Sequence, residues 1–160
     1  MKRRLVFVAI GLAAIFGVMQ LVPYRVSNSP VKQEPTWDSG RTRQLAVAAC
    51  FDCHSNQVNT YSWEKIAPLS WWIKGHVDSG RSSLNLSECT QGGGESDDAV
   101  ETIREGSMPP GYFTWFGLHS SAKLTSAEKD ELAAGLQATL SGWNCGDDDE
   151  DEDEDEDEDD

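Results

Sequence analysis

The chain has 160 residues and a formal net charge of -15. Residues 147–160 hold 14 of its 28 acidic residues, so the remainder carries 14 acidic side chains against 13 Lys and Arg and is almost neutral. Such a balance excludes the broad basic surface that binds nucleic acid, and no DNA or RNA partner is expected. Like charges repel and no apolar side chain accompanies them, so we expect residues 146–160 to be a disordered, solubilising tail.

Residues 1–24 have the pattern of a signal anchor. Three basic residues precede an uncharged apolar run of 18 residues, Leu5 to Val22, which is interrupted only by Gln20. A helix of that length crosses the hydrocarbon core of a bilayer, and basic residues before it stay in the cytoplasm. We predict a single-pass helix in the bacterial cytoplasmic (inner) membrane, with the rest of the chain in the periplasm. A cleavable signal peptide is the alternative, but the run does not end in the small residues of a processing site.

The exported part divides into a linker and one domain. Residues 25–37 contain Pro30 and Pro35 and show no periodicity, which is typical of a tether. We expect the folded domain to span residues 38–145. No stretch alternates apolar and polar residues over the length of a strand, so the domain is predicted to be all α.

Four helices are predicted inside the domain. The first begins at Ser39-Gly40 and runs into Cys50, and the second is opened by Pro68 and ends near Gly80. After a glycine-rich loop at residues 91–94, a short helix is capped by Ser96 and ends at Gly106. The last follows a capping box, Thr125 to Glu128, and carries Leu132, Leu136 and Leu140 on one face.

The string Cys50-Phe51-Asp52-Cys53-His54 indicates a cofactor-binding site. Two thiols three residues apart on one turn can reach the two vinyl groups of a haem, and the adjacent imidazole can bind its iron. We therefore predict one covalent haem c, attached at Cys50 and Cys53 with His54 as an axial ligand. A CxxC pair also occurs in zinc sites and dithiol redox sites, but no second pair of ligands and no βαβ setting accompany it here.

The other axial ligand is predicted to be Met108. It stands before two prolines, which keep this segment out of a helix, and thioether ligation raises the reduction potential of an electron carrier. His119 and His76 are the rival ligands. His54 should donate its second ring N–H to a carbonyl, for which Pro68 is a candidate.

Two cysteines and many aromatic residues remain. Cys89 and Cys145 are predicted to form a disulfide, because unpaired thiols are uncommon in an oxidising compartment. Aromatic side chains are dense and are collectively candidates for burying a haem: Trp37, Tyr61, Trp63, Trp71, Trp72, Tyr112, Phe113, Trp115, Phe116 and Trp143.

The chain from about residue 40 to 143 resembles the bacterial haem-binding domain family of small monohaem c-type cytochromes. The resemblance rests on an ordered series of strings: Cys50-Phe51-Asp52-Cys53-His54-Ser55-Asn56, Ile66-Ala67-Pro68-Leu69-Ser70-Trp71, Val77 with Gly80-Arg81, Leu84-Asn85-Leu86-Ser87-Glu88, Gly106-Ser107-Met108-Pro109-Pro110 with Tyr112, and His119 with Ala122-Lys123-Leu124-Thr125 and Glu128. It implies ligation by His54 and Met108. The chain departs from the family at Thr60-Tyr61-Ser62-Trp63 and at Cys89, where an aromatic residue is usual.

Together these features predict a small, cytochrome-c-like helical domain that passes single electrons between membrane-associated redox proteins and is not an enzyme. The alternative is a haem enzyme or gas sensor, such as a peroxidase-like site, with an open sixth coordination position.

Overall fold

The computed structural model describes residues 1–89 and 96–143. Over these ranges it contains helices and no strands, so the all-α prediction is confirmed there. Short 3-10 helices, labelled η, were not predicted. In chain order the elements are α1 (Lys2–Met19), α2 (Gly40–Ala49), α3 (Phe51–His54), η1 (Ser62–Lys65), α4 (Leu69–Ser83), α5 (Ser96–Glu105), η3 (Gly111–Gly117), η4 (Ser120–Ala122) and α6 (Ser126–Ser141).

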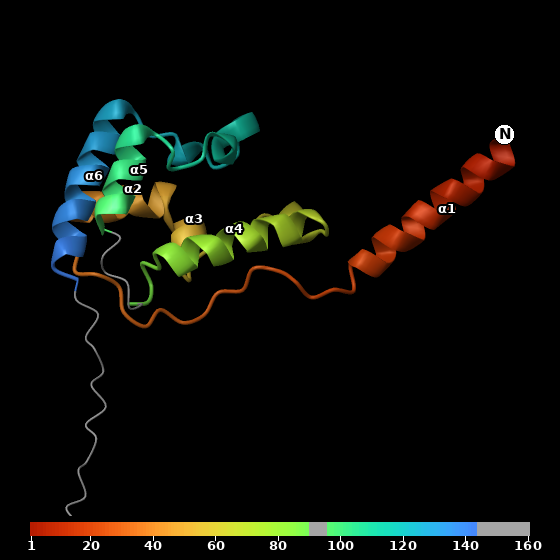
Figure 1. Cartoon of the computed structure of the whole chain (residues 1–160), viewed down its shortest axis with the longest axis horizontal. Helices are drawn as coiled ribbons and strands as arrows, with labels where there is room; N and C mark the ends of the chain where they lie inside the picture. Colours follow the sequence, from red (N-terminus) through yellow and green to blue (C-terminus); the bar gives the residue numbers. More distant parts are fainter. Residues whose placement is uncertain (90–95, 144–160) are drawn as a thin grey trace, which may run out of the picture.

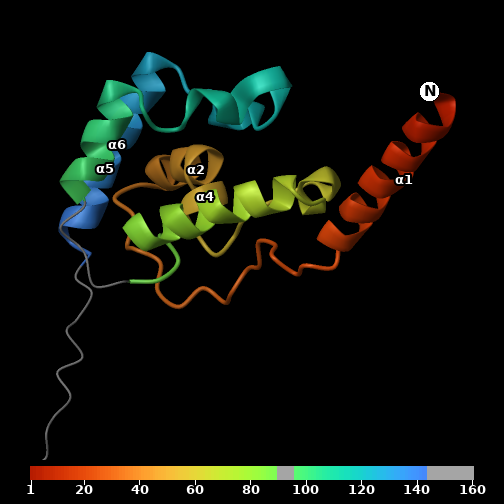
Figure 2. The ribbon, with the colours of Figure 1, turned by 45° about the vertical axis from the view of Figure 1, so that its right-hand side comes forward.

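Helix α1 forms where a membrane-spanning helix is predicted, but it has different limits. Its first turn contains the three basic residues, and the helix ends at Met19, before the last apolar residues of the run. None of its residues is buried, and it stands apart from the other helices in Figures 1 and 2. Within residues 1–89 and 96–143, no helix is both long and apolar enough to cross a membrane. The predicted transmembrane helix is therefore not supported.

Gln20, which interrupts the apolar run, has defined partners. Its side-chain amide donates to the carbonyl oxygen of Ala67 at 3.1 Å and accepts the Ala67 backbone N–H at 3.0 Å. The Tyr24 hydroxyl donates to the carboxylate of Asp78 on α4 at 3.3 Å, and Lys74 Nζ lies 4.8 Å from the centre of the Tyr24 ring. The chain that leaves α1 is thus tied to α4.

The segment predicted as a tether also lies against the domain. The side-chain amide of Asn28 exchanges two hydrogen bonds with the backbone of Val58, at 2.9 and 3.0 Å. Further along, the backbone N–H of Lys32 donates to the carbonyl of Ser87 at 2.9 Å. These bonds join segments far apart in the sequence, so the packed part of the chain begins before the predicted end of the linker.

The hydrophobic core lies where α2, α5 and α6 meet. Helices α5 and α6 run side by side in Figures 1 and 2, with α2 against them. The three leucines predicted to share one face of the last helix are all buried, as expected. The core contains Leu45, Ala46, Ala49, Phe51, Leu86, Val100, Ile103, Ala122, Leu132, Ala133, Leu136 and Leu140.

The predicted caps are confirmed for α2 and α6, whereas Ser96, predicted to cap the third helix, is itself the first residue of α5. Ser39 accepts the backbone N–H of Thr42 at 3.1 Å at the start of α2. Thr125 and Glu128 form the reciprocal capping box of α6, at 3.2 and 2.9 Å. Gly106 follows α5 with φ +78°, a conformation that glycine adopts without steric cost. Helix α4 is the exception, because it continues beyond its predicted end to Ser83.

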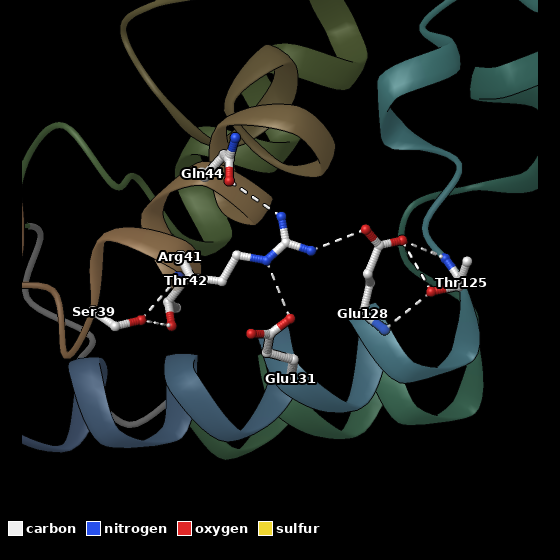
Figure 3. Close-up of polar contacts among 7 residues, drawn as sticks. All are labelled: Ser39, Arg41, Thr42, Gln44, Thr125, Glu128 and Glu131. Carbon is white, nitrogen blue, oxygen red and sulfur yellow. Dashed lines mark hydrogen bonds and ion pairs between the residues drawn. The ribbon is translucent and has the colours of Figure 1, made fainter.

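A surface network joins the start of α2 to the start of α6 (Figure 3). The guanidinium of Arg41 donates to Glu128 at 3.0 Å, to Glu131 at 3.2 Å and to Gln44 at 3.1 Å. Exposed ion pairs of this kind contribute little to stability. The network nevertheless connects the two helices at the surface, and α2 leads directly into Cys50.

Candidate functional site

The two cysteines of the predicted haem motif lie where α2 ends and α3 begins. The backbone N–H of Cys50 donates to Ala46 at 2.8 Å, while its carbonyl accepts the N–H groups of Cys53 at 3.0 Å and His54 at 2.8 Å. One tight turn therefore holds both thiols and the imidazole. Cys50 packs against the hydrophobic core, and both thiols are free. The motif is therefore joined directly to the hydrophobic core.

The imidazole of His54 is held by the backbone. Its Nδ1 lies 3.1 Å from the carbonyl oxygen of Leu84, and because a carbonyl only accepts, Nδ1 carries the proton. Burial lowers the pKa of His54, although hydrogen bonding to the carbonyls of Leu84 and Gly80 opposes the shift. A neutral ring with Nδ1–H engaged presents the lone pair of Nε2, which is the form that binds a metal.

The acceptor for His54 was predicted incorrectly. Pro68 lies at the N-cap position of α4, where its carbonyl accepts the backbone N–H groups of Trp71 at 3.1 Å and Trp72 at 3.3 Å. Helix formation thus uses the oxygen that was assigned to the imidazole. The carbonyl that the imidazole does use belongs to Leu84, at the opposite end of the same helix.

Both thiols lie in surroundings that disfavour the thiolate. Burial raises the pKa of Cys50 to about 12, and the neighbouring Cys53 adds to this shift. Burial also raises the pKa of Cys53 to about 11, with further contributions from the charges of Asp52 and Glu64. Reactive dithiols show the opposite shift. In the described part of the chain, no three His, Cys, Asp or Glu residues converge to hold a metal ion. Neither the dithiol nor the zinc alternative gains support.

The three residues after Cys53 are hydrogen-bonded to the segment that follows α4. The carbonyl of His54 accepts the Leu86 N–H at 2.8 Å, and the N–H of Asn56 donates to the Ser87 hydroxyl at 3.0 Å. The side chain of Asn85 donates to that of Asn56 at 3.1 Å. All three polar side chains are buried, and each is satisfied by this pairing. Their hydrogen bonds fix the direction in which the motif leaves α3.

Two charged side chains complete this support. Arg81 donates to the carbonyl of Ser55 at 2.8 Å. Asn56 donates to the carboxylate of Glu88 at 2.7 Å, a bond that lowers the pKa of Glu88, and Lys32 adds to that effect. The sequence offered these positions only as matches to a family pattern. Their contacts show why the residue types matter: they hold the motif in place.

Gly80 allows α4 to pass directly against the motif. A Cβ atom at this position would lie 2.6 Å from the carbonyl oxygen of Cys53 and 3.2 Å from its Cβ. Any side chain there would collide with the backbone that carries the thiol. From the sequence, Gly80 was predicted only to end a helix, and its neighbouring residues do not indicate that it lies against the backbone of Cys53.

Residues 107–118, the methionine strap, follow α5. Residues 107–110, which include Met108, are non-helical, as predicted, and η3 follows from Gly111 to Gly117. The backbone N–H groups of Ser107 and Met108 both donate to the carbonyl of Thr102, at 3.0 and 3.2 Å. Met108 is 37% exposed. Burial raises the pKa of Tyr112, and the nearby sulfur of Cys53 adds to that shift, so the strap approaches the motif here. Coordination by Met108 stays a prediction.

Nine of the ten aromatic candidates fall into two groups, and the half-buried Trp71 belongs to neither. Trp37, Phe113 and Trp143 pack against the hydrophobic core. The second group is exposed and includes the Tyr112 ring, whose centre lies 5.4 Å from that of Trp72 and 6.5 Å from that of Trp115. Exposed aromatic clusters usually contact another molecule or a ligand. Tyr112 of this group lies near Cys53, and aromatic rings suit a flat apolar cofactor. Its members are Tyr61, Trp63, Trp72, Tyr112, Trp115 and Phe116.

The two rival histidines have different surroundings. His76 is exposed on α4, and its Nδ1 lies 2.9 Å from the carbonyl of Trp72. His119 is largely buried, with one ring nitrogen facing Asp52 and the other facing Glu64. Sequence reasoning did not identify these two carboxylates as partners of His119.

Cys89 is disulfide-bonded. Its predicted partner, Cys145, lies outside the described residues, as do the glycine-rich loop at residues 91–94 and the acidic tail. The Cys89–Cys145 pairing stays a prediction.

Comparison with known proteins bears on the same region. The family model of the haem-binding domain matches residues 14–138, which include the motif, its supporting segments and the methionine strap. No curated protein and no solved structure gives a significant match. The match covers most of the 160 residues and agrees with a site suited to haem. The chain belongs to the haem-binding domain family.

Proposed function

We propose that this haem-binding protein is a c-type cytochrome, with one haem attached at Cys50 and Cys53, and that it carries single electrons. The observation that supports it best is the contact of His54 Nδ1 with the Leu84 carbonyl, which leaves Nε2 for iron. Membership of the family supports haem binding in general. Thioether attachment and the carrier role are the further steps of the proposal.

Each part of the site has a role in this function. A bound haem supplies a one-electron couple at its iron. Cys50 and Cys53 would hold the haem, and the Leu84 carbonyl holds the imidazole of His54. Met108 is assigned the sixth position, where a thioether favours the reduced state. The exposed aromatic group would supply apolar surface against the macrocycle and help to exclude water from it.

The location of the protein is also part of the proposal. Helix α1 carries three basic residues followed by apolar side chains that are exposed along its whole length. This order is typical of a segment that directs export. We propose that it takes the domain to the outer face of the cytoplasmic membrane, where membrane-associated redox proteins are its partners.

Covalent attachment is tested by the mass of protein purified from cells competent for cytochrome maturation. The expected mass is that of the chain plus one haem, and haem staining should survive denaturing electrophoresis. The double variant Cys50→Ser, Cys53→Ser should lose both signals, whereas Cys89→Ser, outside the motif, should keep them. The same measurement shows whether residues 1–24 are retained. A colourless wild-type protein with the mass of the bare polypeptide would overturn the proposal.

The sixth ligand is tested by replacing Met108 with Leu, which keeps the volume and removes the sulfur. The ferric sulfur-to-iron absorption band should disappear. The reduction potential should fall by on the order of tenths of a volt, given the roughly 0.8 V range set by axial ligands. Met19→Leu in α1 is the matched control and should change neither. A high-spin spectrum of the wild-type protein would instead favour the open-site enzyme or sensor.

A further inference from the structure

A buried imidazole between two carboxylates lies beside the haem motif. Nδ1 of His119 is 3.0 Å from the carboxylate of Asp52, the third residue of the motif, and Nε2 is 3.6 Å from the carboxylate of Glu64 in η1. The exposed fractions of the three side chains are 12% for His119, 20% for Asp52 and 7% for Glu64. Charged groups so poorly solvated are costly unless they are paired.

Aromatic rings enclose the imidazole on two sides. The Phe113 ring stacks on it with centres 4.0 Å apart and planes at 17°, and the Tyr61 ring meets it edge-on at 5.5 Å. His119 itself has φ +44°, in the left-handed region that non-glycine residues rarely adopt. Such a conformation persists where surrounding contacts hold it. The contacts here are the two carboxylates and the two rings.

Both carboxylates are themselves fixed to the backbone. The second oxygen of Asp52 accepts the N–H of Asn59 at 3.0 Å, and the second oxygen of Glu64 accepts the N–H of Tyr61 at 2.7 Å. The imidazole is therefore held by two anchored groups, one on each side. Through His119, the chain that follows η3 is tied to the motif and to η1 at the same time.

The tied segment is the one that carries Met108. Residues 107–118, the methionine strap, leave α5 at the Thr102 carbonyl and return to the core through Ala122, whose N–H donates to the His119 carbonyl at 2.9 Å. The strap thus has one attachment on α5 and another at His119. Between them only Phe113 packs against the core, while Trp115 and Phe116 are largely exposed.

From this arrangement we propose that His119 is a positioning residue for the sixth ligand. Its bridge from Asp52 to Glu64 holds the methionine strap against the haem motif, so that the Met108 sulfur is kept in place. His119 does not itself serve as the axial ligand, because both of its ring nitrogens face carboxylates. This inference rests on the proposed function, since it assigns Met108 to the iron.

The experiment compares two melting curves of the intact holoprotein. One follows the ferric sulfur-to-iron band, and the other follows helicity by circular dichroism. In the wild type both should be lost together. In His119→Ala the band should be lost at a lower temperature than helicity, with the covalent haem mass unchanged and the reduction potential lowered. His119→Asn, which tolerates the left-handed conformation and retains a donor near Asp52, should restore most of the band.

A substitution outside the His119 site provides the control. Glu131→Gln removes the exposed ion pair between Glu131 on α6 and Arg41 on α2, at 3.2 Å, and should leave the two curves superimposed. Superimposed curves in His119→Ala would overturn the inference. If that variant does not fold, Glu64→Gln weakens the same bridge at constant volume, and it should separate the curves by a smaller interval.

Failure of the proposed function gives a different result. If the wild type shows no sulfur-to-iron band, the assignment of Met108 is wrong. Amide hydrogen exchange then tests, without the band, whether His119 holds the methionine strap in place. Faster exchange across residues 107–118 in His119→Ala would confirm that His119 holds the strap, and unchanged exchange would refute it.

Discussion

Replacing Gly80 with Ala is expected to destabilise the domain and to lower the yield of covalently attached haem. The added Cβ would lie 2.6 Å from the carbonyl oxygen and 3.1 Å from the carbonyl carbon of Cys53. Backbone atoms cannot rotate away, so α4 or the motif must move. Overpacking of this kind costs about 1–3 kcal/mol, more than the gain in helix propensity of about 1 kcal/mol. Displacing Cys53 also moves one of the two proposed attachment points.

Gly75 provides a matched control in the same helix. A Cβ at Gly75 meets no atom within 4 Å, so Gly75→Ala should stabilise α4 by about 0.5–1 kcal/mol. Urea unfolding measures both variants, and intact mass gives the fraction of chains carrying haem. Equal stability of the two variants, with equal haem content, would show that α4 does not press against the motif as described.

Replacing Gly135 with Ala is expected to separate α6 from α2. Its Cβ would collide with the hydroxyl of Thr42 and would lie 2.6 Å from Cγ2 and 2.9 Å from Cβ of the same residue. Thr42 is 2% exposed, and its hydroxyl is 2.9 Å from that of Ser39 at the cap of α2, so it has little room to move. We expect a loss of about 1–3 kcal/mol. Each kcal/mol lowers the melting temperature by about 4–8 °C in a domain of this size.

A double variant isolates this contact. Thr42→Ala removes the two closest atoms, so Gly135→Ala should cost less in that background than in the wild type. The difference between the two costs is the coupling free energy, expected at about 0.5–3 kcal/mol for residues in contact. Gly40→Ala, where a Cβ meets nothing within 4 Å, serves as the control and should leave the melting temperature nearly unchanged. A coupling of zero would mean that the helices do not approach at this point.

Both glycines show how the site depends on packing between helices. Gly135 sets the distance from α6 to α2, which leads into Cys50, and Gly80 sets the distance from α4 to Cys53. The thiols are therefore placed by two close helix contacts on different sides of the motif. Sequence patterns of hydrophobic residues identify the faces of such helices, but they do not give the distance between the axes.

Several features of the protein were predictable from local sequence. Ser39 and the Thr125–Glu128 box fix the starts of α2 and α6, because a cap and the N–H that it accepts are three residues apart. Gly106 ends α5 for an equally local reason, since it supplies a positive φ. The two prolines after Met108 keep residues 107–110 out of a helix. The string from Cys50 to His54 identifies the cofactor class, because thiols and imidazole on one turn match the haem.

Other features were decided only by the tertiary structure. The acceptor for His54 is the backbone carbonyl of Leu84, and every residue carries such a group, so no residue type marks it. In the sequence Gln20 only interrupts an apolar run, and its role is visible only in the structure, where its side-chain amide is hydrogen-bonded to the backbone of Ala67.

The carboxylates that face His119 were not predicted either, because Asp52 and Glu64 are more than fifty residues away from it in the sequence. Side-chain chemistry, spacing and capping act over one or two turns, and the sequence by itself determines them. Contacts between distant segments depend on how the whole chain packs, and only the folded structure decides them.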